Sequence, residues 1–416
     1  MLKIIYILSM AVAFTYKYDG TLVNFWLKYF IAIGWIILWL FYLLSKQQNI
    51  KGKTMFYIEQ YCKPIIFILA WTFLVWIVNT PAVFDFSFVS RSVSNILCLF
   101  LATQSAIAAC YFFKEKVIEL SVIAILISTA ANVIRVLQIY GINLFFDFLK
   151  TAFIVTDFDS SRPTYAVSQM LEVHDSTLAC GFFIIYYLFF HRKKTKKEWL
   201  YIILLVFCAY IGFKRAAFAG IIVVGLVLFL LKKRTNRFNI IITVIGVIVI
   251  SVSFLYIVAM KNNLLEIMAN TIGLDFSGRF MIYDELSKYY SLWPTYMGYG
   301  YGYINKLFED SMKLASHCDI VRMYIELGFV PYLLWLYHYL IRVPKRALNK
   351  YGIDVARVIT ASTVYLFTTY FVGNAMNMFC VQYSFILIPV ALSYIIDNSK
   401  GRLKSEDCNI IHAEGH

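Results

Sequence analysis

The sequence predicts an all-α polytopic integral membrane protein. Residues of the set AVILMFWYC make up 61% of the 416 positions, and charged residues only 15%, whereas soluble domains carry roughly 25% charged residues. Apolar runs recur along the whole chain, with lengths close to the ~20 residues that a helix needs to cross the hydrocarbon. Helices are required because lipid cannot satisfy exposed backbone N–H and C=O groups.

We expect a single membrane domain over residues 1–416 with about twelve transmembrane helices. The predicted spans are 3–16, 22–44, 64–80, 93–113, 117–139, 171–190, 199–213, 216–231, 239–258, 320–341, 355–372 and 378–396. The first apolar stretch resembles a signal peptide, but it lacks a cleavage signal and begins a series of spans, so we expect a retained helix.

The distribution of Lys and Arg predicts the topology. Two short loops, HRKKTKKE (191–198) and KKRTNR (232–237), are typical cytoplasmic anchors. They place both termini inside and residues 259–319, between the ninth and tenth spans, outside as a large loop. The net charge of +14 is therefore explained by membrane topology, and we expect no nucleic acid partner.

A smaller outside loop is expected at 140–170. Its first half, INLFFDFLKTAF, has the pattern of a segment lying flat in the interface, and VTDFDSSRPTYAVSQ has that of a loop. A simple connector is the alternative. The unequal outside loops and the lack of a visible internal repeat disfavour an inverted-repeat transporter.

The eight cysteines show no paired or metal-like spacing. We therefore expect no disulfide, no metal site and no cofactor.

Lys214 and Arg215 are the first candidate site residues. They lie in CAYIGFKRAAFAG, the middle of a long uncharged stretch that fits two short spans. A 15-residue helix reaches about 22 Å, less than the roughly 30 Å of hydrocarbon, so the turn is expected to be sunken in the outer leaflet. The two cations either extend to the headgroups or serve a function there, and a guanidinium suits a phosphate ester.

The large outside loop holds two more candidates. Arg279 follows a glycine in SGRFMIYDEL, where a surface salt bridge with Asp275 or Asp284 is the simpler interpretation. The run MGYGYGYIN lacks the strand and helix context of a nucleotide loop. It predicts a tight, Tyr-lined turn against the membrane surface, and Tyr301 lies within it.

His317 precedes the tenth predicted span in SHCDIVRMYIELG. An imidazole titrates near neutral pH and suits proton removal from a sugar hydroxyl. The alternative is a polar residue at a helix start, with Ser316 or Asp319 as the cap. Arg322 and Glu326 are four residues apart and are expected to pair, although Arg322 is also a candidate for a polar cavity.

These stretches together resemble the O-antigen polymerase and O-antigen ligase superfamily. The resemblance rests on the order and spacing of KRAAFAG, SGRFMIYDEL, WPTYMGYGYG and SHCDIVRMYIELG, over roughly Gly212 to Gly328. Cys318 departs from the His-Asn or His-Ser of many relatives.

The resemblance implies a GT-C-like membrane glycosyltransferase in the bacterial inner membrane, with its active site on the periplasmic side. Undecaprenyl diphosphate-linked oligosaccharides would be donor and acceptor, without a nucleotide sugar or a metal. It implies that Arg215 and Arg279 hold the diphosphate and that His317 engages the acceptor hydroxyl. Lys214, Arg322 and Tyr301 would support substrate binding.

A polymerase of repeat units is the favoured interpretation, because the high Phe and Tyr content and the closing motif resemble polymerases more. A ligase that transfers polymer to lipid A-core, or a transporter or flippase of lipid-linked saccharide, is the alternative. A chain-length regulator protein is a partner that only the resemblance implies; membrane lipids are the other expected contact.

Overall fold

The computed structural model describes residues 1–15, 26–46, 52–78, 86–151, 163–171, 174–190, 194–212, 215–231, 237–272, 279–311 and 318–394. These residues form helices and connecting turns, and no strand occurs among them. The all-α prediction is therefore confirmed for the described part of the chain.

The first half of the chain contains the long helices. They are α1 (Leu2–Thr15), α2 (Leu27–Ser45), α3 (Lys53–Val78), α5 (Phe86–Phe113), α6 (Lys116–Thr151), α7 (Pro163–Leu171), α8 (His174–Ile185), the π-helical turn η1 (Tyr186–Phe190), α9 (Lys196–Ile211) and α10 (Arg215–Leu230).

The second half contains one long helix, several short ones and a final pair. They are α11 (Phe238–Lys261), α12 (Leu264–Ile272), α13 (Arg279–Ser287), α14 (Tyr303–Ser311), α15 (Asp319–Leu327), α16 (Phe329–Tyr337), the π-helical turn η2 (His338–Arg342), α17 (Val343–Tyr351), α18 (Ile353–Val372), the 3₁₀ turn η3 (Ala375–Asn377) and a last helix, Phe379–Tyr394.

Among the described residues, five helices are long and apolar enough to cross a membrane: Leu27–Ser45, Thr54–Val78, Ser87–Phe113, Lys116–Lys150 and Phe238–Lys261. Four shorter apolar helices accompany them, including Leu2–Thr15 and Ala216–Leu230. Large apolar side chains are exposed along these helices, for example Leu255 on α11 at 67%. An apolar surface of this kind is compatible with a membrane-embedded protein, because lipid covers it at no cost.

Where they are described, the twelve stretches predicted as spans are helical, but some boundaries differ. Helices α3 and α5 begin at Lys53 and Phe86, well before the predicted starts at 64 and 93. Hydropathy detects the part of a helix that matches hydrocarbon, and helical hydrogen bonding continues into the polar turns beside it. Helix α6 bends at Gly141, where φ is 77°, and continues to Thr151. Residues 142–151 of the loop predicted at 140–170 are therefore helical.

The continuous span predicted at 320–341 is interrupted. Gly328 adopts a φ of 79° and ends α15, and α16 starts at the next residue. A positive φ is readily available only to glycine, and it turns the chain out of the helical path. The hydropathy of 320–341 carries no sign of this break.

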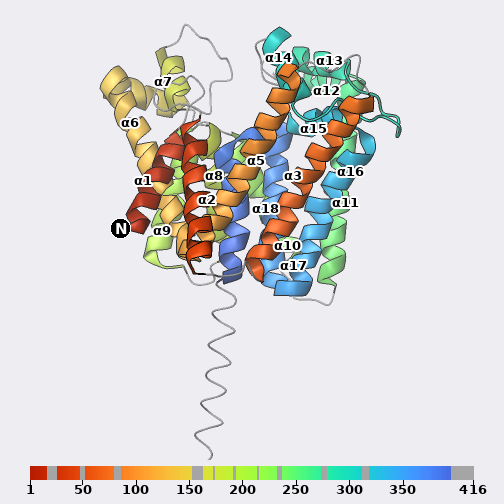
Figure 1. Ribbon diagram of the computed structural model, residues 1–416. Helices are drawn as coiled ribbons and strands as arrows, with labels where there is room; N and C mark the ends of the chain where they lie inside the picture. Colours follow the sequence, from red (N-terminus) through yellow and green to blue (C-terminus); the bar gives the residue numbers. More distant parts are fainter. Residues whose placement is uncertain are drawn as a thin grey trace, which may run out of the picture.

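The large loop predicted at 259–319 contains three short helices. We name the region from Leu264 to Ser311 the cap; its described residues are 264–272 and 279–311. Figure 1 shows α12, α13 and α14 gathered at one end of the helix bundle, with α15 beneath them.

Glycines allow close packing at the centre of the bundle. Helix α10 packs along α18, and the Tyr365 ring of α18 lies where side chains on Gly181 and Gly220 would be. A Cβ at Gly220 would lie 2.7 Å from the Tyr365 ring. The Tyr365 hydroxyl also donates a hydrogen bond to the Leu178 carbonyl at 2.8 Å. Small residues at helix contacts are the common way to bring membrane helices together.

This packing predicts that Gly181→Ala destabilises the protein by about 1–3 kcal/mol, because the added methyl displaces Tyr365 from a full interface. Unfolding in mixed detergent micelles, followed by circular dichroism, measures the change. Gly34→Ala is the matched control, since nothing lies within 4 Å of a Cβ at Gly34. Equal effects of the two substitutions would contradict the packing.

Candidate functional site

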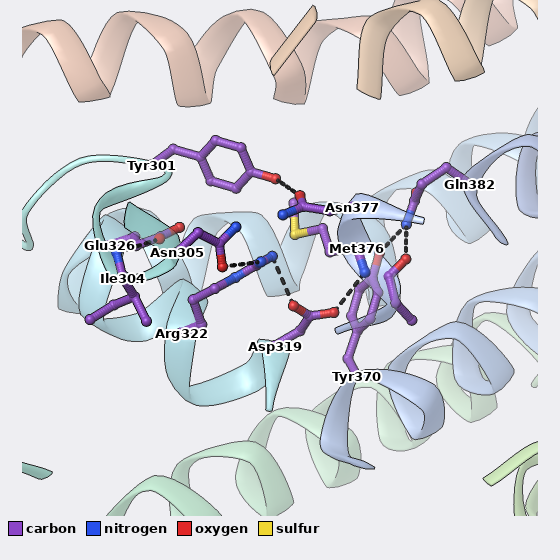
Figure 2. A network of polar contacts seen from close by, with 11 residues as sticks. Tyr301, Ile304, Asn305, Asp319, Arg322, Glu326, Tyr370, Met376, Asn377 and Gln382 are labelled. Carbon is purple, nitrogen blue, oxygen red and sulfur yellow. Dashed lines mark hydrogen bonds and ion pairs between the residues drawn. The ribbon is translucent and has the colours of Figure 1, made fainter. Parts of the chain in front are cut away.

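The structure locates the predicted site residues to different degrees. Arg215 is the first residue of α10 and Arg279 the first residue of α13, and for both the description covers the backbone only. Lys214 and His317 lie outside the described residues. Tyr301 and Arg322 are described in full, and they lie together in a buried polar cluster (Figure 2).

Helix α15 is the framework of this cluster. All nine of its side chains are buried, including Asp319, Arg322 and Glu326 at 0% exposure. Three ionisable groups within three turns of one enclosed helix are unusual, because an isolated charge loses its hydration energy when it is buried. Partners from other segments are therefore required.

Arg322 has partners from three segments. Its Nη2 lies 2.8 Å from Asp319 Oδ1 in an ion pair one turn earlier on the same helix. Its Nη1 donates a hydrogen bond to Asn305 Oδ1 of α14 at 3.2 Å. The guanidinium carbon lies 5.8 Å from the centre of the Tyr301 ring, within the range of a cation–π contact.

The predicted pairing of Arg322 with Glu326 is wrong. Arg322 pairs with Asp319, three residues before it, and Glu326 Oε1 accepts a hydrogen bond from the Ile304 backbone N–H at 3.1 Å. Glu326 thus caps the start of α14. Both i,i+3 and i,i+4 spacings bring side chains together on a helix, so the sequence is compatible with either Asp319 or Glu326 as the partner of Arg322. The position of α14, whose backbone binds Glu326, decides between them.

Asp319 also connects α15 to the turn that follows α18. Its Oδ2 accepts a hydrogen bond from the Met376 backbone N–H at 2.6 Å, and its own N–H donates to the Gly373 carbonyl at 3.2 Å. Asp319 was expected as a possible cap of its own helix. The N-cap residue is instead Cys318, without a side-chain cap, and the Asp319 carboxylate binds the turn at Met376.

Tyr301 completes the connection. Its hydroxyl donates a hydrogen bond to Asn377 Oδ1 at 2.7 Å, and only 1% of the residue is exposed. Figure 2 shows Tyr301 and Asp319 reaching the same short turn that carries Met376 and Asn377. The cap, α15 and the end of α18 therefore share one polar junction, which we name the Arg322 junction: Tyr301, Asn305, Asp319, Arg322, Met376 and Asn377.

The Gly-Tyr run lies against protein, which corrects the expectation of a turn against the membrane surface. Tyr299 N–H donates to the Ile325 carbonyl at 3.2 Å, and Gly300 N–H to the Glu326 carbonyl at 2.8 Å. These bonds satisfy carbonyls at the end of α15 that have no helical partner. Gly298, at a φ of 82°, packs so closely against the end of α15 that a Cβ there would lie 2.5 Å from the Glu326 carbonyl oxygen.

Two long helices hold the same run from the other side. The Tyr301 N–H donates to Thr72 Oγ1 of α3 at 3.0 Å, and Ser92 Oγ of α5 donates to the Tyr301 carbonyl. Trp71 of α3 donates its indole N–H to the Leu327 carbonyl at 2.8 Å. The backbone around Tyr301 is thus fixed by hydrogen bonds to the bundle as well as to α15.

Within the described part of the chain, Asp319 Oδ1 and Arg322 Nη2 make no hydrogen bond besides their ion pair with each other. Two further polar atoms of the cluster have neither a hydrogen-bond partner nor an ion partner among the described residues. They are Arg322 Nε and Glu326 Oε2, both buried. Buried polar atoms are normally satisfied by protein or by ordered water. Arg322 and Glu326 therefore each have the capacity for one more polar contact.

Two carboxylates of α13, Asp284 and Glu285, have a described cationic partner. Asp284, named above as a possible partner of Arg279, lies 3.9 Å from Lys288. Lys288 also binds Glu285 at 2.7 Å, and this contact lowers the pKa of the Glu285 carboxyl. Lys288 therefore has two of the nearby carboxylates as partners.

Four residues of the junction were missed by sequence reasoning: Asn305, Met376, Asn377 and, as an ion partner, Asp319. The spacing of Asp319 and Arg322 was the available signal. Nothing in the sequence connects Asn377, more than fifty residues later, to either. In the described ranges, no three His, Cys, Asp or Glu side chains lie close enough together to hold a metal ion.

Comparison of the sequence with models of protein families and with curated proteins finds no match.

The junction predicts strong coupling between Asp319 and Arg322. Asp319→Asn and Arg322→Gln should each cost about 3–5 kcal/mol of unfolding free energy, because each leaves its buried partner without a counter-charge. The double variant should cost clearly less than the sum of the two. Detergent unfolding of all four proteins measures this cycle.

Lys150→Ala is the control for that cycle, since it removes an exposed ion pair with Asp147 at 3.3 Å. No measurable change is expected there. Additive effects of Asp319→Asn and Arg322→Gln would show that the pair is not energetically coupled.

Proposed function

We propose that the protein is a membrane glycosyltransferase that polymerises undecaprenyl diphosphate-linked repeat units. The observation that carries the proposal is the convergence of the motif stretches. The Gly-Tyr run and the closing stretch are adjacent in space: the N–H groups of Tyr299 and Gly300 donate hydrogen bonds to the carbonyls of Ile325 and Glu326.

The two stretches are thus neighbours through backbone hydrogen bonds, although nothing in their sequences pairs them. The third stretch, KRAAFAG, is connected to the closing stretch by helix α18. Gly220 at its end packs against Tyr365 of α18, and the turn after α18 accepts the N–H of Asp319 at Gly373. One helix therefore joins the segment that begins at Arg215 to the segment that follows His317.

The proposed reaction is a glycosyl transfer without a change in oxidation state. A hydroxyl oxygen of the acceptor unit attacks the anomeric carbon of the donor chain, and the bond from that carbon to the phosphate oxygen breaks. Undecaprenyl diphosphate leaves with the electron pair, and His317 takes the hydroxyl proton. Arg215 and Arg279 stabilise the negative charge that grows on the diphosphate, with Lys214 beside them.

Arg322 and Tyr301 have positioning roles in this proposal. Both are buried at the junction, where their polar atoms bind protein groups. Asp319, the ion partner of Arg322, lies two residues after His317 in the sequence. Fixing Asp319 to the turn after α18 restricts the positions that His317 can occupy.

The proposal includes twelve spans in the bacterial inner membrane, cytoplasmic termini and a periplasmic cap. Its support is the helical state of the predicted stretches and the Lys- and Arg-rich loops at 191–198 and 232–237. The cap would then face the compartment in which the lipid-linked units are joined.

The test is complementation of a deletion strain, with the surface polysaccharide separated on a gel. Arg215→Ala, Arg279→Ala and His317→Ala should each lower polymer formation by a factor of about 100 or more, because each removes a group that acts on the transition state. Arg215→Lys keeps the positive charge but loses the bidentate contact with phosphate, so intermediate activity is expected.

Lys288→Ala, at an exposed position just after α13, is the control, and immunoblots check that every variant is made. Loss of a polymerase leaves lipid A-core capped by one repeat unit. Bare core with polymer retained on the carrier would indicate a ligase, and the absence of units outside would indicate a flippase. Normal ladders from the three alanine variants would refute the site assignment.

A further inference from the structure

Helix α12 has an apolar face that none of the described segments covers. Leu264, Ile267 and Met268 are exposed at 45%, 58% and 57%. At 100° per residue, these three side chains lie within one sector of about 100° on the helix. Glu266, also exposed, lies on the opposite side.

Leu265 shows which side of α12 faces the rest of the protein. It is half-buried and packs against the main hydrophobic core. Helix α12 therefore contacts the protein along one flank and exposes an apolar face and an acidic face on either side of that flank. This is the pattern of a helix that lies in an interface between an apolar and an aqueous phase.

The position of α12, directly after a membrane-length helix, indicates that the apolar phase is lipid. Helix α11, one of the five membrane-length helices, ends at Lys261, and α12 begins three residues later. Asn263, at a φ of 54°, turns the chain between them. Leu255, on the last turns of α11, is exposed at 67%. The exposed apolar surface of this membrane-length helix therefore extends to the turns just before α12.

The end of α11 is also fixed to the cap. Lys261 Nζ donates hydrogen bonds to the Ser287 carbonyl and, at 2.8 Å, to the Tyr290 carbonyl. The start of α12 is therefore held beside the end of α11, where a membrane-crossing α11 would leave the hydrocarbon. A helix that starts there with a free apolar face is placed at the boundary between headgroups and acyl chains.

We propose that α12 is an interfacial helix whose face of Leu264, Ile267 and Met268 lies in the lipid headgroup and acyl boundary. The bilayer that α11 crosses supplies the lipid. The contact anchors the cap to the membrane surface, and it depends on the helix face alone, whatever reaction the protein performs.

Site-directed spin labelling in liposomes tests the proposal. Single cysteines are introduced as Ile267→Cys and Met268→Cys on the apolar face and as Glu266→Cys on the opposite face. The seven described native cysteines are buried, and Cys408→Ser removes the eighth. Leu255→Cys on α11 gives the reference for a lipid-facing site.

Labels at Ile267→Cys and Met268→Cys should collide several-fold more with oxygen, relative to a water-soluble nickel complex, than the label at Glu266→Cys. They should lie between the Leu255→Cys and Glu266→Cys values. Equal access of the nickel complex to both faces would overturn the proposal. Spin–spin broadening at the apolar face would also overturn it and would indicate contact with a second copy of the chain.

Discussion

A buried guanidinium requires a counter-charge and hydrogen-bond acceptors close to it. This requirement determines how the segments beneath the cap are arranged. Arg322 is fully buried, and its partners come from its own helix, from α14 and from the Gly-Tyr run. Asp319 then binds the turn after α18. Because a buried charge that loses one partner is costly, these segments are held together as a unit. The pair is therefore better understood as a determinant of position than as a large net source of stability.

Close packing extends this unit into the bundle. Tyr365 fills the space left by Gly181 and Gly220, so α18 lies directly against α8 and α10. At its other end α18 leads to the turn that Asp319 and Tyr301 bind. A rigid helix between a charged junction and a glycine-lined contact fixes the separation of the segments at both ends. Such a frame is what a site assembled from distant motifs needs, because small displacements of reacting groups reduce rates strongly.

Much of the helical fold was predictable from the sequence, because the apolar stretches report directly on burial in protein or lipid. The break at Gly328 was not, since glycine is common inside membrane helices and only the neighbouring Gly-Tyr run shows why the chain turns there. In the site, the sequence identified Arg322 and Tyr301 but assigned Arg322 the wrong carboxylate. The choice between Asp319 and Glu326 depends on α14 and on the turn after α18, which are contacts made in three dimensions.

We propose that the segments of Arg215, Arg279 and His317 form one site beside the junction. A cryo-EM structure of the protein in a lipid nanodisc with a bound undecaprenyl diphosphate-linked saccharide tests it most directly. The account predicts both guanidinium groups within about 3 Å of diphosphate oxygens, and the His317 imidazole facing the acceptor side of the same cavity. A diphosphate bound without either arginine, or His317 in a separate part of the protein, would contradict it.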